Sequence, residues 1–231
     1  MSNWRLDSTA LPCKVNAMEP NWAEENLKVI RTLMERSAMY RRALAPVMFS
    51  TGFLGVAGWQ IGDRFGVEGY EPFLCLWFTV AAFAIGASLL IVRRQALSSS
   101  EPFWTSPTKR VTQAMIPPLV AGLLFSLIPL PANLGDAKYP DYHAVWILLY
   151  GCALNSAGQF ISRGVRLLGW AFIVASLLIF CMELYSPLGT GPNGKPSVWF
   201  QPNALMGLTF GGFHLIAGIY LYFTEKSRNA Q

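Results

Sequence analysis

Few side chains in this sequence combine a polar group with a position deep inside an apolar stretch. His214 lies in one such stretch, and Asn155 and Gln159 lie in another. At about 1.5 Å per residue, His214 and Asn155 come to nearly the same depth, roughly 15 Å, if both stretches are helices. One interpretation is a hydrogen bond between these two side chains that holds neighbouring helices together. The other is a ligand-binding cavity formed by His214, Asn155 and Gln159.

Catalytic chemistry has little support in this sequence. The chain has only two histidines, and it lacks the motifs of zinc hydrolases, serine hydrolases and phosphate-binding loops. The remaining enzymatic alternative pairs Glu183 with His143 as an acid and a base at the outer surface. His143 and His214 differ too much in depth to ligate one haem together. We therefore expect no catalytic residue and no metal site, and the sequence identifies no cofactor.

The elements that must position these side chains are six long apolar stretches. Each is close to the ~20 residues that a helix needs to cross ~30 Å of hydrocarbon. Hydrophobic residues make up 53% of the 231 residues, and charged residues make up 13%. The sequence therefore predicts an all-α polytopic bundle of six transmembrane helices within residues 43–224. The predicted spans are 43–61, 73–92, 111–130, 143–161, 167–184 and 204–223.

Basic residues are distributed unevenly between the loops. All but three of the eighteen lie in the termini or in every second loop, and the exceptions are Arg64, Lys138 and Lys195. Lys and Arg are held on the cytoplasmic side during insertion, so both tails, residues 1–20 and 225–231, are expected in the cytoplasm. The net charge of +5 follows from this topology. Since no nucleic-acid-binding motif accompanies it, we expect no nucleic-acid partner.

Residues 21–42 have the pattern of an amphipathic helix at the inner membrane surface. Asn21 and Glu24 resemble a capping box, and Leu27, Ile30 and Met34 line one face. This face is suited to anionic lipid or to a partner protein. The alternative is a helix that simply leads into the first span until Pro46 kinks it.

The loop between the second and third spans supplies a second candidate docking element. Phe103 and Trp104 follow a helix-start signal there. Together with the apolar face of residues 21–42, they define a predicted interaction surface, which consists of Leu27, Ile30, Met34, Phe103 and Trp104.

Small residues and prolines give two further expectations about the spans. Gly207 and Gly211 form a GxxxG pair, which predicts close helix packing. Pro117 and Pro118 are expected to break the hydrogen-bond ladder of the third span. A disulfide between Cys75 and Cys181 is left open, because both lie about one turn below the outer surface; the alternative is that they are small core residues.

Residues 27–46, 101–104, 110–118 and 221–226 carry a resemblance. In these segments the chain resembles an uncharacterised family of bacterial polytopic inner-membrane proteins. The resemblance covers most of the chain from Asn21 onward and implies a helical fold in a bacterial cytoplasmic membrane. The family has no established activity, so the resemblance implies no site residue or cofactor.

The functional prediction is a non-enzymatic membrane component that acts by association. Such a protein is an accessory subunit or a regulatory scaffold of a membrane complex, in contact with the lipid bilayer and with a partner protein or further copies of itself. The alternative is a small-molecule transporter or channel with a site near His214 and Asn155. A continuous polar cavity through His214, Asn155 and Gln159 would favour the alternative, and a dry, packed interior would count against it.

Overall fold

The structure is a computed structural model that describes residues 20–98, 106–127, 142–161, 163–185 and 201–229. The chain divides into two units, residues 1–39 and 40–231. Throughout the described ranges the regular elements are helices, in agreement with the predicted all-α class. They are α1 (Pro20–Arg64), α2 (Tyr70–Ser98), α3 (Ser106–Leu127), α4 (Tyr142–Gly158), α5 (Arg163–Tyr185), α6 (Pro202–Met206), the π-helix η3 (Gly207–Phe213) and α7 (His214–Asn229).

Five segments of the described chain are long and apolar enough to cross a membrane. They are Leu44–Arg64, Tyr70–Ser98, Thr108–Leu127, Arg163–Met182 and Pro202–Thr224. The stretch predicted as the fourth span, residues 143–161, corresponds to α4, which has 17 residues and a length of about 25 Å. A helical fold suited to a membrane is therefore confirmed, and the count of six spans stays a prediction.

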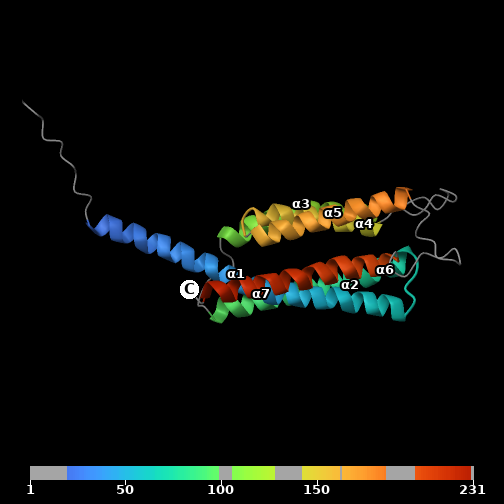
Figure 1. Ribbon diagram of the computed structural model, residues 1–231, viewed down its shortest axis with the longest axis horizontal. Coiled ribbons are helices and arrows are strands. Elements are labelled where there is room, and N and C mark those ends of the chain that lie inside the picture. The colour runs from blue at the N-terminus through green and yellow to red at the C-terminus, as the bar shows by residue number, and fades with distance from the viewer. Residues whose placement is uncertain (1–19, 99–105, 128–141, 162, 186–200, 230–231) are drawn as a thin grey trace, which may run out of the picture. The chain divides into compact units, whose positions relative to one another are not determined.

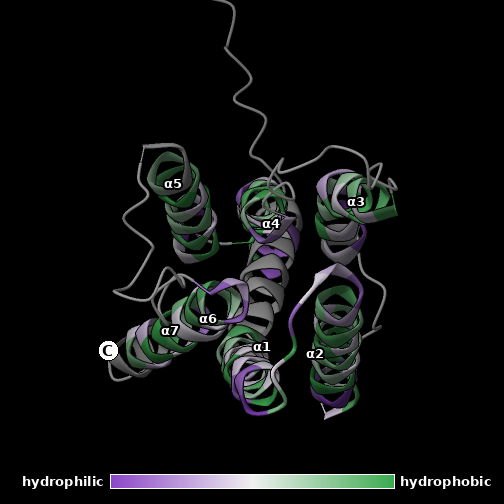
Figure 2. Cartoon of the chain, turned by 90° about the vertical axis from the view of Figure 1, so that its right-hand side faces the viewer, coloured by the Kyte–Doolittle hydropathy of each residue, from purple (hydrophilic) through white to green (hydrophobic). Residues whose placement is uncertain are grey.

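The helices of residues 40–231 form two layers. α3, α4 and α5 make one layer, and α1, α2 and the continuous α6–η3–α7 segment make the other (Figure 1). Viewed along the helices, α4 and α1 occupy the middle of their layers, and the helix sides are mainly hydrophobic (Figure 2). More than half of the α4 residues are buried, with Ala144 and Ile147 fully so. The core thus lies around α4, between the two layers.

Glycines allow the helices to approach until backbones touch. A Cβ atom added to Gly55 of α1 would lie 2.6 Å from the backbone N of Gly211 in η3. A Cβ atom on Gly207 would lie 2.3 Å from Cβ of Trp59. The close packing predicted from the pair Gly207 and Gly211 is therefore confirmed, and α1 is its partner.

Prolines lie inside α1 and α3 without ending these helices. α3 runs from Ser106 to Leu127 through both Pro117 and Pro118, so the two prolines remove hydrogen bonds from the ladder, as expected, without ending the helix. α1 likewise continues through Pro46. The fixed φ of proline, near −65°, suits a helix, and the missing N–H removes a hydrogen bond without forcing the chain to turn.

A tight connection joins α1 to α2. Gly66 and Gly69 have φ values of 56° and 89°, which glycine adopts without a steric penalty. Between them, the carbonyl of Val67 accepts a hydrogen bond of 2.9 Å from Nδ2 of Asn203. The Oδ1 atom of Asn203 accepts a second hydrogen bond of 3.0 Å from Nε1 of Trp77. Asn203 thus ties the beginning of α6 to α2 and to the α1–α2 turn, which fixes the entry into η3.

Candidate functional site: a buried histidine and tyrosine at a π-helical turn

The sixth apolar stretch changes its helix type in the middle. α6 passes into η3 over Gly207–Phe213, and α7 begins at His214. A π-helical turn is wider than an α-helical turn, is rare, and is found frequently at functional sites. Because His214 directly follows η3, this turn sets the direction of its side chain.

His214 is 1% exposed and has a partner at each ring nitrogen. Its Nδ1 atom lies 2.7 Å from the carbonyl oxygen of Phe210. A carbonyl only accepts hydrogen bonds, so Nδ1 carries the proton and donates it. In the neutral ring Nε2 is then an acceptor, and it lies 2.8 Å from the hydroxyl of Tyr150, which donates. The histidine is held in one tautomer, and the protein itself uses both nitrogens.

Aromatic rings surround this pair. The ring of His214 lies 5.5 Å from those of Tyr150 and Phe172, and it stacks on Phe210 at 6.4 Å with an interplanar angle of 11°. Phe172, which is fully buried, also meets the edge of Phe213 at 5.2 Å. Such tilted and edge-to-face contacts stabilise a packed core beyond the area that they bury. The pair therefore occupies an apolar, aromatic environment built from α4, α5, η3 and α7.

The expected bond between His214 and Asn155 is not formed, because Tyr150 occupies the Nε2 atom of His214. Tyr150 and Asn155 are five residues apart on α4, which is a rotation of about 140° around the helix axis. Asn155 packs against α5 instead, where a Cβ atom on Gly169 would lie 2.5 Å from its backbone N. Its buried side-chain Oδ1 has no hydrogen-bond partner among the described residues.

Gln159 lies farther still from the predicted cavity. It follows the last residue of α4 and is exposed. No hydrogen bond within the described ranges joins Gln159, Asn155 and His214. Their role as a ligand-binding set stays a prediction, although the structure places His214 in a different cluster.

Tyr150 is the residue of this centre that the sequence interpretation missed. A tyrosine in the middle of an apolar stretch carries a hydroxyl that needs a partner, and His214 is the polar group at matching depth. That signal was present in the sequence. The polar contacts near the opposite ends of the helices were also missed: Trp146 donates a hydrogen bond of 2.7 Å to the hydroxyl of Ser126, and the hydroxyl of Tyr70 donates to the backbone carbonyl of Ser126.

The remaining predicted residues are distributed as follows. His143 lies in the first turn of α4 and is buried within the protein; its place at the outer surface of a membrane stays a prediction. Its proposed partner Glu183 has a side chain outside the described part of the structure. Leu27 is 65% exposed. The side chains of Ile30 and Met34, and the whole of Phe103 and Trp104, lie outside the described residues.

The cysteines and the acidic residues assemble no further site in the described segments. Cys75 and Cys181 are exposed free thiols, and Cys152 is free as well. No disulfide therefore joins Cys75 to Cys181. Among the described residues, no group of three His, Cys, Asp or Glu side chains lies close enough to hold a metal ion.

Comparisons with protein-family models, curated proteins and solved structures found no match to this chain. The basis for a functional proposal is therefore the geometry of the chain itself: a closed histidine–tyrosine centre within a bundle of apolar helices.

Proposed function

We propose that this protein is a multi-pass membrane component that acts by association, as an accessory subunit or regulatory scaffold of a membrane complex. The observation that supports this proposal best is the closed state of His214. Its two nitrogens are bonded to Tyr150 and Phe210, so no ring lone pair is free for a metal or a ligand. This buried histidine then serves packing.

A small-molecule transporter or channel is the second candidate, and one observation favours it. Within the described part of the chain, the buried Oδ1 of Asn155 has no partner, and an unsatisfied buried acceptor costs roughly 1–3 kcal/mol. A water molecule or a donor group of a solute would remove this cost. However, Asn155 faces α5 while His214 is bonded to Tyr150, so the two do not form one polar path. The closed His214 centre and its separation from Asn155 therefore favour the association proposal over a transport path.

The proposed topology has six spans with both termini in the cytoplasm of a bacterial cell, and α4 is the fourth of these spans. The charges of the described residues support it. Basic side chains lie where α2 ends and where α3 and α5 begin, and the opposite end has Arg64 together with Asp63, Glu68 and Glu71. The basic set consists of Arg93, Arg94, Lys109, Arg110, Arg163 and Arg166. In this topology residues 21–42 form an amphipathic helix at the inner membrane surface.

Labelling of single cysteines will test the topology. In a chain without its four native cysteines, Gly191→Cys is expected to react with a membrane-impermeant thiol reagent added from outside intact cells. Ser98→Cys, at the basic end, is the matched control and should react only after the membrane is opened. Labelling of Gly191→Cys only from the cytoplasm would show that the topology is inverted or that a span is missing.

Site-specific photo-crosslinking will test the association. With a photoreactive residue at Leu27, we expect one dominant protein adduct in native membranes and the same protein at a fixed ratio after mild-detergent purification. Phe83 of α2 has the same exposure, 65%, and is the control that should react mainly with lipid. A chain that stays monomeric in mild detergent and gives no protein adduct from Leu27 would contradict the proposal.

A further inference from the structure

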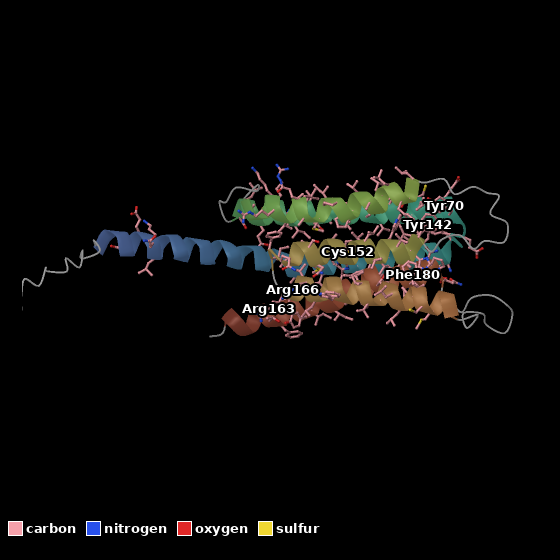
Figure 3. All side chains as sticks on the ribbon, turned by 90° about the horizontal axis from the view of Figure 1, so that it is seen from above. Tyr70, Tyr142, Cys152, Arg163, Arg166 and Phe180 are labelled. Atoms are coloured by element: carbon pink, nitrogen blue, oxygen red, sulfur yellow. The ribbon has the colours of Figure 1, made fainter. Side chains whose placement is uncertain are left out.

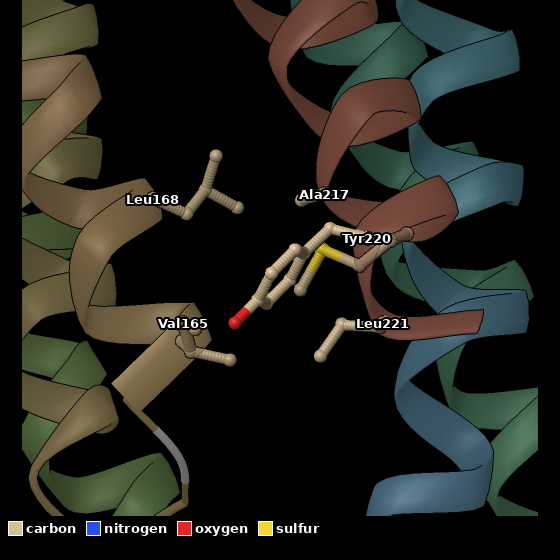
Figure 4. Close-up of a pocket in the computed structure, with 7 residues that line it drawn as sticks. Val165, Leu168, Ala217, Tyr220 and Leu221 are labelled. Carbon is tan, nitrogen blue, oxygen red and sulfur yellow. The ribbon is translucent and has the colours of Figure 1, made fainter. Parts of the chain in front are cut away.

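The cavity between α5 and α7 is too small to receive a partner. Its volume is about 10 Å³, which is space for a single water molecule. Figure 4 shows the ring of Tyr220 reaching from α7 towards Val165 of α5, with Leu168 on the same side as Val165. At this place the bundle therefore accepts no side chain from another molecule.

One outer face of α3, in contrast, is exposed along the helix. The other face packs on α4, where Trp146 donates a hydrogen bond of 2.7 Å to the hydroxyl of the buried Ser126. α3 lies at the edge of its layer (Figure 2). The residues at the centre of its exposed face recur at alternating spacings of four and three residues, the pattern of a helix that packs along a second helix. This α3 seam consists of Gln113, Pro117, Val120, Leu124 and Leu127.

Gln113 brings a hydrogen-bond donor and an acceptor to this seam. Within the described ranges, its carboxamide has no hydrogen-bond partner. Pro117 lies one turn later and has no N–H, so the backbone carbonyl of Gln113 loses its helical donor. Both groups belong to the segment Thr108–Leu127, which is apolar enough to cross a membrane. Lipid tails satisfy neither the amide nor the carbonyl, so a protein partner is needed.

The position of Gln113 along α3 keeps its carbonyl away from the headgroups. Figure 3 shows Arg163 and Arg166 of α5 at one end of the bundle, and α3 begins at the same end, with Arg110 in its second turn. Gln113 lies about 4.5 Å farther along the helix. Arg110 has a long side chain that extends to the headgroup layer. The carbonyl of Gln113 points in the opposite direction along the helix axis, into the hydrocarbon.

We propose that the α3 seam binds the α3 seam of a second copy of this chain in a two-fold symmetric dimer. Two copies inserted in the same orientation are related by an axis along the membrane normal, so each seam residue meets its own counterpart. The carboxamide of Gln113 in one copy donates to the freed carbonyl of Gln113 in the other, and the reverse bond forms at the same time. Val120, Leu124 and Leu127 continue the contact along the helix.

Self-complementarity is the reason for choosing a second copy as the partner. A two-fold interface requires that one patch carry both halves of each contact, and the seam carries the donor and the acceptor at the same residue. A different protein would have to supply both groups at this depth. The dimer goes beyond the proposed function, because the α3 seam is separate from the surface at Leu27. A missing dimer would leave the outcome at Leu27 unaffected.

Disulfide crosslinking in native membranes will test the interface. In the full chain without its four native cysteines, Val120→Cys is expected to give a covalent dimer after mild oxidation, because the two copies of a seam residue face each other. Val174→Cys in the middle of α5 is the matched control, since Val174 is also exposed but lies outside the seam. It should stay monomeric. No dimer from Val120→Cys, or an equal yield from both variants, would overturn the interface.

Energy transfer between labelled copies in phosphatidylcholine vesicles will test the polar contact. Gln113→Leu should weaken the association by roughly tenfold, because it removes two interhelical hydrogen bonds from each dimer. Gln95→Leu makes the same change on α2 and should leave the association unchanged. Unchanged association in Gln113→Leu, or equal weakening in both variants, would contradict the proposal.

The two prolines of α3 provide a second, independent pair of variants. Pro117→Ala restores the helical N–H to the carbonyl of Gln113 and should weaken the association by roughly threefold, although it stabilises the helix itself. Pro118→Ala restores the bond to the carbonyl of Ala114, which lies outside the seam, and should have no effect on association. Equal effects of the two substitutions would overturn the freed carbonyl of Gln113 as the acceptor.

Discussion

Replacement of Gly211 by alanine is expected to destabilise the bundle by about 3 kcal/mol, the upper range for a group forced into a filled core. The new Cβ atom would lie 2.7 Å from Cγ2 of Val56 and 2.9 Å from the backbone N of Val56. A helix backbone cannot yield locally, so α1 and η3 would have to separate. Gly212 is the matched control, because it is the next residue of the same π-helix and has nothing within 4 Å of its added Cβ atom.

Both alanine variants can be compared by reversible unfolding of the purified protein in mixed micelles of mild detergent and dodecyl sulfate. Gly212→Ala should stay within about 1 kcal/mol of the wild type, which is the size of the helix-propensity difference between glycine and alanine. If both substitutions cost the same, the important property of Gly211 would be its backbone freedom in the π-helix. The close approach to α1 would then not explain its effect.

The second large effect is expected at the histidine–tyrosine centre. His214→Ala should cost about 3 kcal/mol, because it leaves the hydroxyl of Tyr150 and the carbonyl of Phe210 without their partner in an apolar environment. Tyr150→Phe removes only the hydroxyl and should cost about 0.6–1.7 kcal/mol, as measured for interhelical hydrogen bonds in membranes. The double variant should cost less than the sum of the two single variants. The difference is the coupling energy of the pair.

Asn155→Ala is the control for this cycle. If His214 were bonded to Asn155, as one sequence interpretation suggests, their substitutions would be coupled, and Tyr150→Phe would be independent of His214. The structure predicts the reverse. Absorbance and mass spectra of the purified variants provide a second readout: a bound pigment or cofactor that is lost with His214→Ala would contradict the closed state of the ring and support a binding site.

The sequence predicts the helical class well because the relevant signal is local. Long uncharged stretches have few other ways to satisfy their backbone groups, and all of them became helices in the described chain. The fourth stretch shows the limit of this inference. The apolar stretch continues to Ile161, but α4 ends at Gly158. An added Cβ atom at Gly158 would lie 2.6 Å from the backbone N of Arg166. That ending depends on the packing of α5, which no local pattern contains.

The histidine centre shows a second limit. His214, which residue counting places deep within its stretch, is buried. Its partner depends on rotation about the helix axis, and η3 alters the rotation of α7 relative to a uniform α-helix. The residues of η3, such as Gly207 and Gly211, are also typical of ordinary close-packed helices. Counting residues at α-helical spacing therefore predicts Asn155 as the partner of His214, whereas the partner in the structure is Tyr150.

The shortness of α4 has a consequence for how the bundle would respond to bilayers of different hydrophobic thickness. At about 25 Å, α4 is shorter than the ~30 Å of a typical hydrocarbon layer, but neighbouring helices cover more than half of its residues. By contrast, only 6% of the apolar window of α2 is buried. Mismatch between helix and lipid is relieved by tilting where helix meets lipid. A thinner or thicker membrane would therefore change the tilt of α2 first. The His214–Tyr150 centre, to which α4 contributes Tyr150, would be shielded from this change.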